Sequence, residues 1–140
     1  MILGVHPYIR TNGNGLEVVK FYENALDAEL IGVQTYGDFP ENPEFPLSEE
    51  MKSLVAHAQL KIGESYLMLS DNFPEEPYQI GEQLNVALLL KDVEKIKTIF
   101  NNLADGGEAL MPLQETPFSP AYGQVKDKYG ITCQISAVDD

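Results

Sequence analysis

The chain repeats one order of predicted elements, and this internal repeat constrains its fold more than any other feature. Residues 5–70 predict a strand, an amphipathic helix and three further strands, and residues 84–136 predict the same order in a shorter form. A duplicated unit within a domain-sized chain indicates two modules that pair around a shared cavity. We therefore expect one domain over 1–140, with module one at about 4–71 and module two at about 84–137.

Each half contains one helix, recognised by apolar residues at helical spacing. The helix of the first half follows the turn at 12–15, where Asn14 is a plausible cap, and that of the second half follows Asp92. The first apolar stripe is broad and consists of Leu16, Val19, Tyr22 and Leu26, with Val18, Phe21 and Ala25. The second consists of Val93, Ile96, Ile99, Phe100 and Leu103.

Strands fill most of the remaining sequence. They are predicted at 4–11, 30–36, 53–62 and 65–70, and again at 84–90, 109–113, 122–126 and 131–136. Residues 37–50 hold three prolines and five acids and predict a surface loop. Because one helix covers only one face of a four-stranded sheet, the other face needs a cover. The predicted fold class is α+β: two βαβββ modules forming a curled mixed sheet, a half-barrel with a cleft inside and helices outside.

Strand alternation divides the side chains into a packed set and a cleft-facing set. Ile131, Cys133 and Ile135 are predicted to pack under a helix, as are Leu67 and Leu69. In the strand at 53–62, alternation assigns Val55 to the same face as His57 and Gln59.

The cleft-facing set combines aromatic rings with a few hydrogen-bonding groups. This mixture is typical of a small-molecule pocket, although a sheet face that meets water or a second subunit is the alternative. The set comprises His6, Tyr8, Arg10, His57, Gln59, Tyr66, Met68, Asn85, Thr132 and Gln134.

Charge and composition exclude several classes of partner. A net charge of −13 repels both nucleic acid and anionic lipid. No apolar run approaches the ~20 residues that span a bilayer, and the N-terminus lacks the features of a secretory signal. One cysteine cannot form an internal disulfide, so we expect a cytoplasmic protein. The acids at 41–50 and 75–76 predict a solvated face; the alternative, a cation site, has no support in their spacing.

Several segments, in order along the chain, resemble the vicinal oxygen chelate superfamily, and more narrowly its PhnB-like branch. They are Pro7-Tyr8-Ile9, Phe21-Tyr22-Glu23-Asn24-Ala25-Leu26, His57-Ala58-Gln59-Leu60-Lys61-Ile62-Gly63, Leu67-Met68-Leu69-Ser70-Asp71, Met111-Pro112-Leu113 and Tyr122-Gly123-Gln124-Val125-Lys126-Asp127. This superfamily includes glyoxalase I, extradiol dioxygenases and the bleomycin and fosfomycin resistance proteins. The resemblance implies the paired-module fold, a homodimer, and a divalent ion held by His or Glu on the first and last strand of each module.

The positions that match those ligands are His6, Met68, Asn85 and Gln134. Only His6 is a good ligand, because methionine suits soft ions and neutral amide oxygens bind divalent cations weakly. We therefore expect no complete metal site and no assigned catalytic residue. A divalent metal stays possible, with His6 and His57 as its weak candidate ligands.

For three residues the sequence leaves two possible roles open. His57 is a substrate-contacting or structural histidine, or else a general base or ligand. Arg10 pairs with one of the many acids, or holds a carboxylate or phosphate of the ligand. Cys133 is an inert buried thiol, or else a nucleophile.

Two functions fit these residues, and the sequence leaves open whether the protein is an enzyme. The first is a PhnB-like protein that binds a partly aromatic or amphiphilic small molecule in the cleft, as a homodimer, without a complete metal site. The alternative is a metal-dependent lyase, isomerase or dioxygenase of the same superfamily.

Overall fold

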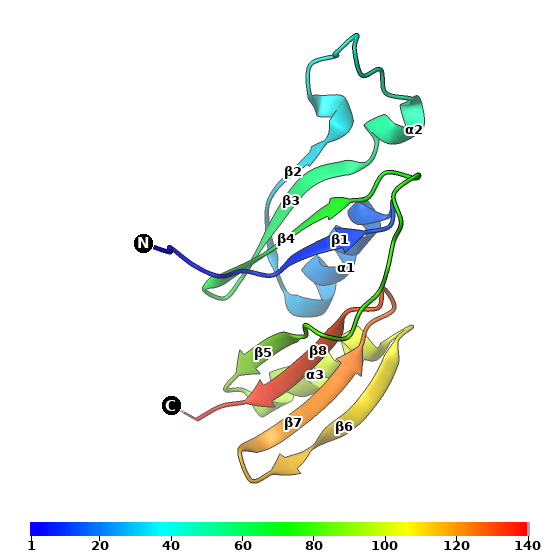
Figure 1. Cartoon of the computed structure of the whole chain (residues 1–140). Helices are drawn as coiled ribbons and strands as arrows, with labels where there is room; N and C mark the ends of the chain where they lie inside the picture. The colour runs from blue at the N-terminus through cyan, green and yellow to red at the C-terminus, as the bar shows by residue number, and fades with distance from the viewer. Residues whose placement is uncertain (140) are drawn as a thin grey trace. The chain divides into compact units, whose positions relative to one another are not determined.

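The computed structural model describes residues 1–139 and divides into two compact units, one at residues 1–78 and one that begins at Gln79. Each unit contains one βαβββ module, with its helix against one face of a four-stranded sheet (Figure 1). The prediction of an α+β fold built from two such modules is confirmed. Two further predictions, a single domain and the joining of both sheets into one half-barrel, stay predictions.

Module one has seven elements. They are β1 (Tyr8–Thr11), α1 (Gly15–Leu26), β2 (Glu29–Thr35), the single 3-10 turn η1 (Tyr36–Asp38), α2 (Glu49–Lys52), β3 (Val55–Ile62) and β4 (Ser65–Asp71). The strand order in the sheet is β1-β4-β3-β2, with β1 parallel to β4 and the other pairs antiparallel. The expected loop at 37–50 thus includes part of η1 and the start of α2.

Module two repeats this order without the two short helices. It contains β5 (Val86–Leu90), α3 (Val93–Ala104), β6 (Glu108–Thr116), β7 (Ser119–Lys126) and β8 (Thr132–Ala137). Its strand order, β5-β8-β7-β6, and its parallel first pair reproduce those of module one. Parallel pairing of the first and last strands brings Tyr8 opposite Met68 and Ala87 opposite Gln134, so these pairs occupy equivalent positions.

Each helix buries most of its apolar stripe against the sheet of its own module, but Leu16 in the first turn of α1 is 45% exposed, contrary to the prediction. Val18 and Tyr22 of α1 are buried with Leu67 and Leu69 of β4, as predicted for these two leucines. In module two the buried stripe of α3, including Ile96 and Leu103, packs on β7 and β8. Cys133 and Ile135 are buried as predicted, whereas Ile131 precedes β8 and is half-buried.

The predicted face of Val55 is wrong, because β3 contains a bulge. Gln34 pairs with His57 but the next residue, Thr35, pairs with Val55, so Ala56 is an extra residue in β3. Val55 is fully buried, and its side chain lies against Gly15 of α1. The bulge therefore turns Val55 to the helix side while His57 and Gln59 keep the opposite side.

The starts of the two helices differ from each other. Asp92 caps α3 as predicted, accepting hydrogen bonds from the backbone N–H groups of Glu94 and Lys95. Asn14 occupies the N-cap position of α1, but its side chain accepts from Asn12 instead and caps nothing in the helix. The N–H of Gly15 donates to the Asp71 carboxylate at 2.9 Å, so a distant strand end satisfies the start of α1.

Within residues 1–139, every helix is too short or too polar to cross a membrane.

Candidate functional site

Module one gathers seven predicted site residues on the face of its sheet opposite α1. Tyr8, Met68 and Gln59 stand in one row across β1, β4 and β3. All three are half-buried or exposed, whereas their strand neighbours Ala58 and Leu69 are buried. The seven are His6, Tyr8, Arg10, His57, Gln59, Tyr66 and Met68, and none is fully buried.

Two aromatic pairs organise this face. The Tyr8 hydroxyl lies 3.4 Å from Nδ1 of His57, and the two ring centroids are 5.9 Å apart. His6 and Tyr66 meet edge to face at 5.4 Å, and Nδ1 of His6 accepts a hydrogen bond of 3.2 Å from the backbone N–H of Tyr66. Both imidazoles are therefore held by neighbours on the sheet, as expected of structural or ligand-contacting histidines.

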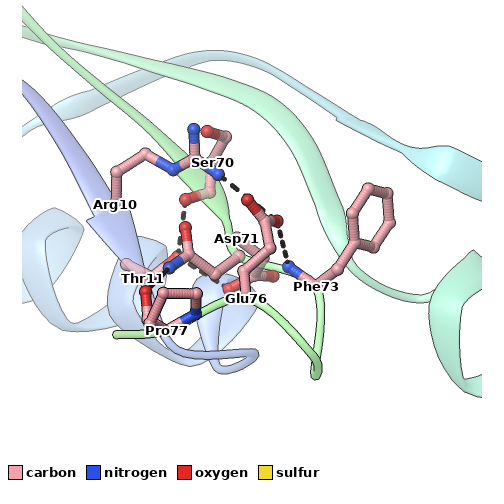
Figure 2. A network of polar contacts seen from close by, with 8 residues as sticks. Arg10, Thr11, Ser70, Asp71, Phe73, Glu76 and Pro77 are labelled. Atoms are coloured by element: carbon pink, nitrogen blue, oxygen red, sulfur yellow. Dashed lines mark hydrogen bonds and ion pairs between the residues drawn. The ribbon is translucent and has the colours of Figure 1, made fainter. Parts of the chain in front are cut away.

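Arg10 points towards the segment that follows β4 rather than across the sheet. Its guanidinium lies 3.8 Å from the Glu76 carboxylate, which also accepts a 2.7 Å hydrogen bond from the N–H of Phe73 (Figure 2). The Arg10 side chain is half exposed, so this ion pair contributes little to stability. The pairing with an acid is the arrangement expected for Arg10, and it neutralises the one arginine of the chain.

In module two, a chain of neutral hydrogen bonds crosses the face opposite α3. The Gln134 amide donates to Asn85 Oδ1 at 3.2 Å, and its oxygen accepts from the Tyr122 hydroxyl at 2.8 Å. The Gln124 amide in turn donates to the same hydroxyl at 2.8 Å. Asn85 and Gln134 are thus brought together as predicted, and the half-buried Thr132 lies on the same strand as Gln134.

Sequence reasoning missed Tyr122 and Gln124. Both are half-buried on β7, where they alternate with the buried residues Ala121, Gly123 and Val125. The same alternation that identified β8 could have found them, because Gln124 stands opposite Gln134 as Gln59 stands opposite Met68.

The donors at the family's metal positions do not fit a divalent ion. Nδ1 of His6 already accepts the Tyr66 N–H, and both ends of the Gln134 amide are hydrogen-bonded. Met68 is a soft thioether, which hard or borderline ions bind poorly. In the part of the chain that the structure describes, no three His, Cys, Asp or Glu side chains are grouped in a way that could hold a metal.

The single thiol is buried and unreactive in character. Cys133 is 2% exposed under α3. Burial, together with the nearby charge of Asp127, raises the pKa of this thiol from 9.0 to about 12. The thiolate is the nucleophilic form, so Cys133 is a packing residue rather than a nucleophile near neutral pH.

Residues 6–135 match the family described as the Glyoxalase/Bleomycin resistance protein/Dioxygenase superfamily. The chain belongs to this superfamily. The predicted membership of the vicinal oxygen chelate superfamily is therefore confirmed.

Individual members are similar over almost the whole chain. Protein YjdN of Escherichia coli is 29% identical over 138 residues, which are 94% of this chain and 93% of YjdN. The crystal structure of protein PA1353 from Pseudomonas aeruginosa has a TM-score of 0.86 at 30% identity, covering 99% of this chain and 100% of PA1353. A PhnB protein from Bacillus cereus shares the fold, with a TM-score of 0.76 at 24% identity over 96% of this chain and 98% of that one.

Proposed function

We propose that this member of the superfamily binds a partly aromatic or amphiphilic small molecule on the sheet faces opposite α1 and α3, without a complete metal site. The observation that carries the proposal is the chemistry of these faces at matched register positions. Module one presents the rings of Tyr8, His57 and Tyr66, and module two presents the amides of Gln124 and Gln134. Rings with a few fixed polar groups are the usual lining of ligand sites.

The two faces would recognise different parts of a ligand. The half-buried rings of module one suit a flat apolar group, which gains burial and edge or offset stacking. The amide chain of module two offers neutral donors and acceptors, which suit a carbonyl, amide or hydroxyl group. We propose further that both faces line one cleft.

The experiment is a thermal-shift screen of small aromatic and amphiphilic compounds, followed by calorimetric titration of each hit. Gln134→Ala should weaken a hit about tenfold, because its loss leaves Tyr122 and Asn85 without their shared partner. Gln79→Ala, an exposed glutamine outside the strands, is the matched control and should change nothing. If no compound shifts the melting temperature, or if both variants act alike, the proposal is wrong.

If both faces line one cleft, one ligand should contact both of them. Met68→Ala removes contact area from module one, so it should weaken the same ligand that Gln134→Ala weakens. A ligand that responds to only one of these two substitutions would contradict the shared cleft while leaving single-face binding in place.

The second candidate is a metal-dependent lyase, isomerase or dioxygenase, which is favoured by a relative of the same fold. A mutant of the fosfomycin resistance protein FosX from Listeria monocytogenes was solved with Mn(II) and a dihydroxypropylphosphonic acid. Elemental analysis of untagged protein and titration with manganese, zinc, nickel and iron decide the matter. Stoichiometric metal that is lost in His6→Ala would establish the enzyme and overturn the metal-free proposal.

We also propose that the protein is a cytoplasmic homodimer. Two exposed apolar residues, Leu89 of the edge strand β5 and Leu84 just before it, support association, and the single buried thiol suits a reducing compartment. Sedimentation analysis at micromolar concentration tests the dimer, and a purely monomeric protein would contradict it.

A further inference from the structure

The segment between β2 and β3 encloses a cavity of about 500 Å³ that belongs to neither sheet face. Its size lies in the range of ~300–1,000 Å³ that is usual for small-molecule sites. The walls are mostly apolar. The residues that line it are Tyr36, Gly37, Phe39, Pro40, Glu41, Asn42, Pro43, Phe45, Pro46, Leu47 and Lys52.

The cavity is built by fixed backbone rather than by a loose loop. The N–H of Tyr36 donates to Leu54 O, and the N–H of Thr35 donates to the Asp38 carboxylate at 2.8 Å. A side chain at Gly37 would approach the Lys52 carbonyl to 2.9 Å, so η1 and the end of α2 are in close contact. Prolines at 40, 43 and 46 restrict the backbone of the rim further.

Aromatic packing joins the cavity to the rest of module one. The Tyr36 ring meets Phe39 edge to face at 6.1 Å and lies 4.9 Å from the Phe73 ring. Phe73 is itself positioned by the Glu76 carboxylate, which pairs with Arg10 (Figure 2). One wall is therefore joined to the segment after β4, while Phe39 and Phe45 keep 45% and 71% of their surface exposed.

The charge around the cavity selects the kind of ligand. Residues 36–52 contain five acids and a single cation, Lys52. Lys52 is engaged with Glu49 at 3.1 Å and with Glu41 at 3.9 Å, so its charge is compensated within the segment. The remaining negative field attracts cations, and the exposed faces of Phe39 and Phe45 attract them further through cation–π contact.

We propose that this cavity is a second binding site, distinct from the sheet faces, for a flat aromatic organic cation. The ring system of the ligand packs against the phenylalanines and prolines, and its positive charge is attracted by the acids of residues 38–50, of which Glu41 lines the cavity. Inorganic cations are not its ligand, because the lining supplies apolar surface in place of grouped oxygen donors.

The test is a fluorescence titration of the intact chain with proflavine, a planar aromatic cation, and with anilinonaphthalene sulfonate, an aromatic anion. Proflavine should bind once per chain and more tightly than the anion. Phe45→Ser should weaken proflavine about tenfold. Phe118→Ser is the matched control, because Phe118 in module two is equally exposed at 70%, and it should have no effect.

A second pair of substitutions isolates the charge. Glu41→Gln combined with Glu44→Gln should weaken proflavine about threefold to fivefold, with the larger loss at low salt. Glu75→Gln, an exposed acid outside the segment, should leave the affinity unchanged.

Three results would overturn the proposal. The first is proflavine affinity that survives Phe45→Ser or that falls with Met68→Ala instead, which would place the dye on the sheet face. The second is equal or tighter binding of the anion. The third is an absence of dye binding together with a change of oligomeric state in Phe45→Ser, which would assign the cavity to contact between copies of the chain.

Discussion

The two modules share one topology but secure the end of the sheet by different means. In module one the buried carboxylate of Asp71 accepts hydrogen bonds from the Thr11 hydroxyl, the Gly15 N–H and the Val55 N–H at 2.7–2.9 Å. It thereby joins β4 to β1, α1 and β3. At the equivalent position module two has Ala137. Its backbone carbonyl accepts a hydrogen bond of 2.7 Å from the Ser119 hydroxyl.

The difference shows that a repeated fold does not require repeated polar chemistry. The Asp71 carboxylate and its three donors form a charged hub with strong, charge-assisted hydrogen bonds. Changing one partner leaves a buried charge or donor unsatisfied, which costs much stability. A hydroxyl between two strands is weaker and more tolerant. Module one therefore depends on a single residue more heavily than module two does, and four sets of substitutions can break or sharpen this comparison.

The largest effect is expected from Asp71→Asn. An amide at this position presents N–H groups to backbone donors and leaves them unsatisfied in a site that is 1% exposed. We expect a loss of about 2–4 kcal/mol in the free energy of unfolding, measured by urea denaturation. Ser119→Ala should cost about 1 kcal/mol, and the exposed Asp105→Asn should cost almost nothing.

Hydrogen exchange locates the loss. Protection in Asp71→Asn should fall within residues 1–78 and remain in β7 and β8. Equal losses in both modules, or a larger cost for Ser119→Ala, would contradict the comparison.

Gly15→Ala is the next in size and tests how tightly the hub is enclosed. A methyl group at Gly15 would lie 2.8 Å from both the Asp71 carboxylate and the Val55 side chain. We expect a loss of about 1–3 kcal/mol, because neither neighbour can move without breaking its own contacts. Gly32→Ala is the control, since an added methyl group there meets nothing within 4 Å. If Gly15→Ala leaves the melting temperature unchanged, the residues around the Asp71 carboxylate can move to make room for a methyl group.

Cys133 predicts a dependence on pH that resides in module two alone, because its counterpart in module one is Leu67. Burial and Asp127 raise the pKa of this thiol to about 12 in the folded chain, against 9.0 when exposed. The unfolded chain therefore loses the proton first as pH rises, and the folded state loses about 1 kcal/mol between about pH 8 and pH 10.

The measurement is urea denaturation of the protein and of Cys133→Ala at both pH values. The loss specific to the thiol should be absent in the variant. A thiol reagent should also modify Cys133 only in urea, and rapid modification of the folded protein would contradict its burial.

The smallest effects concern the hydroxyls of the two open faces. Tyr122→Phe removes the group that links Gln134 and Gln124, and should cost about 0.5–1 kcal/mol. Tyr8→Phe breaks one long contact of 3.4 Å to His57 and should cost less. Thermal denaturation of both variants measures the two losses. A larger loss in Tyr8→Phe than in Tyr122→Phe would show that the Tyr8–His57 contact is the stronger of the two.

Periodicity made most of the fold predictable. Apolar stripes predicted both helices, and alternation correctly assigned His57, Gln59, Cys133 and Ile135 to their faces. It failed at Val55, because the extra residue in β3 is recognisable only from the partner strand. Asn14 stands at the predicted N-cap position but its side chain does not cap the helix, since the group that accepts from the Gly15 N–H lies 56 residues away.

Alternation also predicted part of the two sheet faces opposite α1 and α3. His6, Tyr8, Met68 and Gln134 follow from alternation together with resemblance to the superfamily. Alternation along β7 would also have placed Tyr122 and Gln124 on the open face, but nothing else in the sequence marks them as binding residues. The cavity beside α2 depends on how the prolines and aromatic rings of residues 36–52 pack against one another and against α2, whereas the composition of this segment predicts only a surface loop.

The bulge at Ala56 has a consequence for how the protein can change. It separates β3 into a short beginning, which faces the helix, and a longer remainder, which carries His57 and Gln59. Removal of this one residue would place Val55 directly before His57, and regular alternation would still keep the two on opposite faces. The strand can therefore gain or lose this residue while Val55 stays on the anchoring side and His57 on the open side.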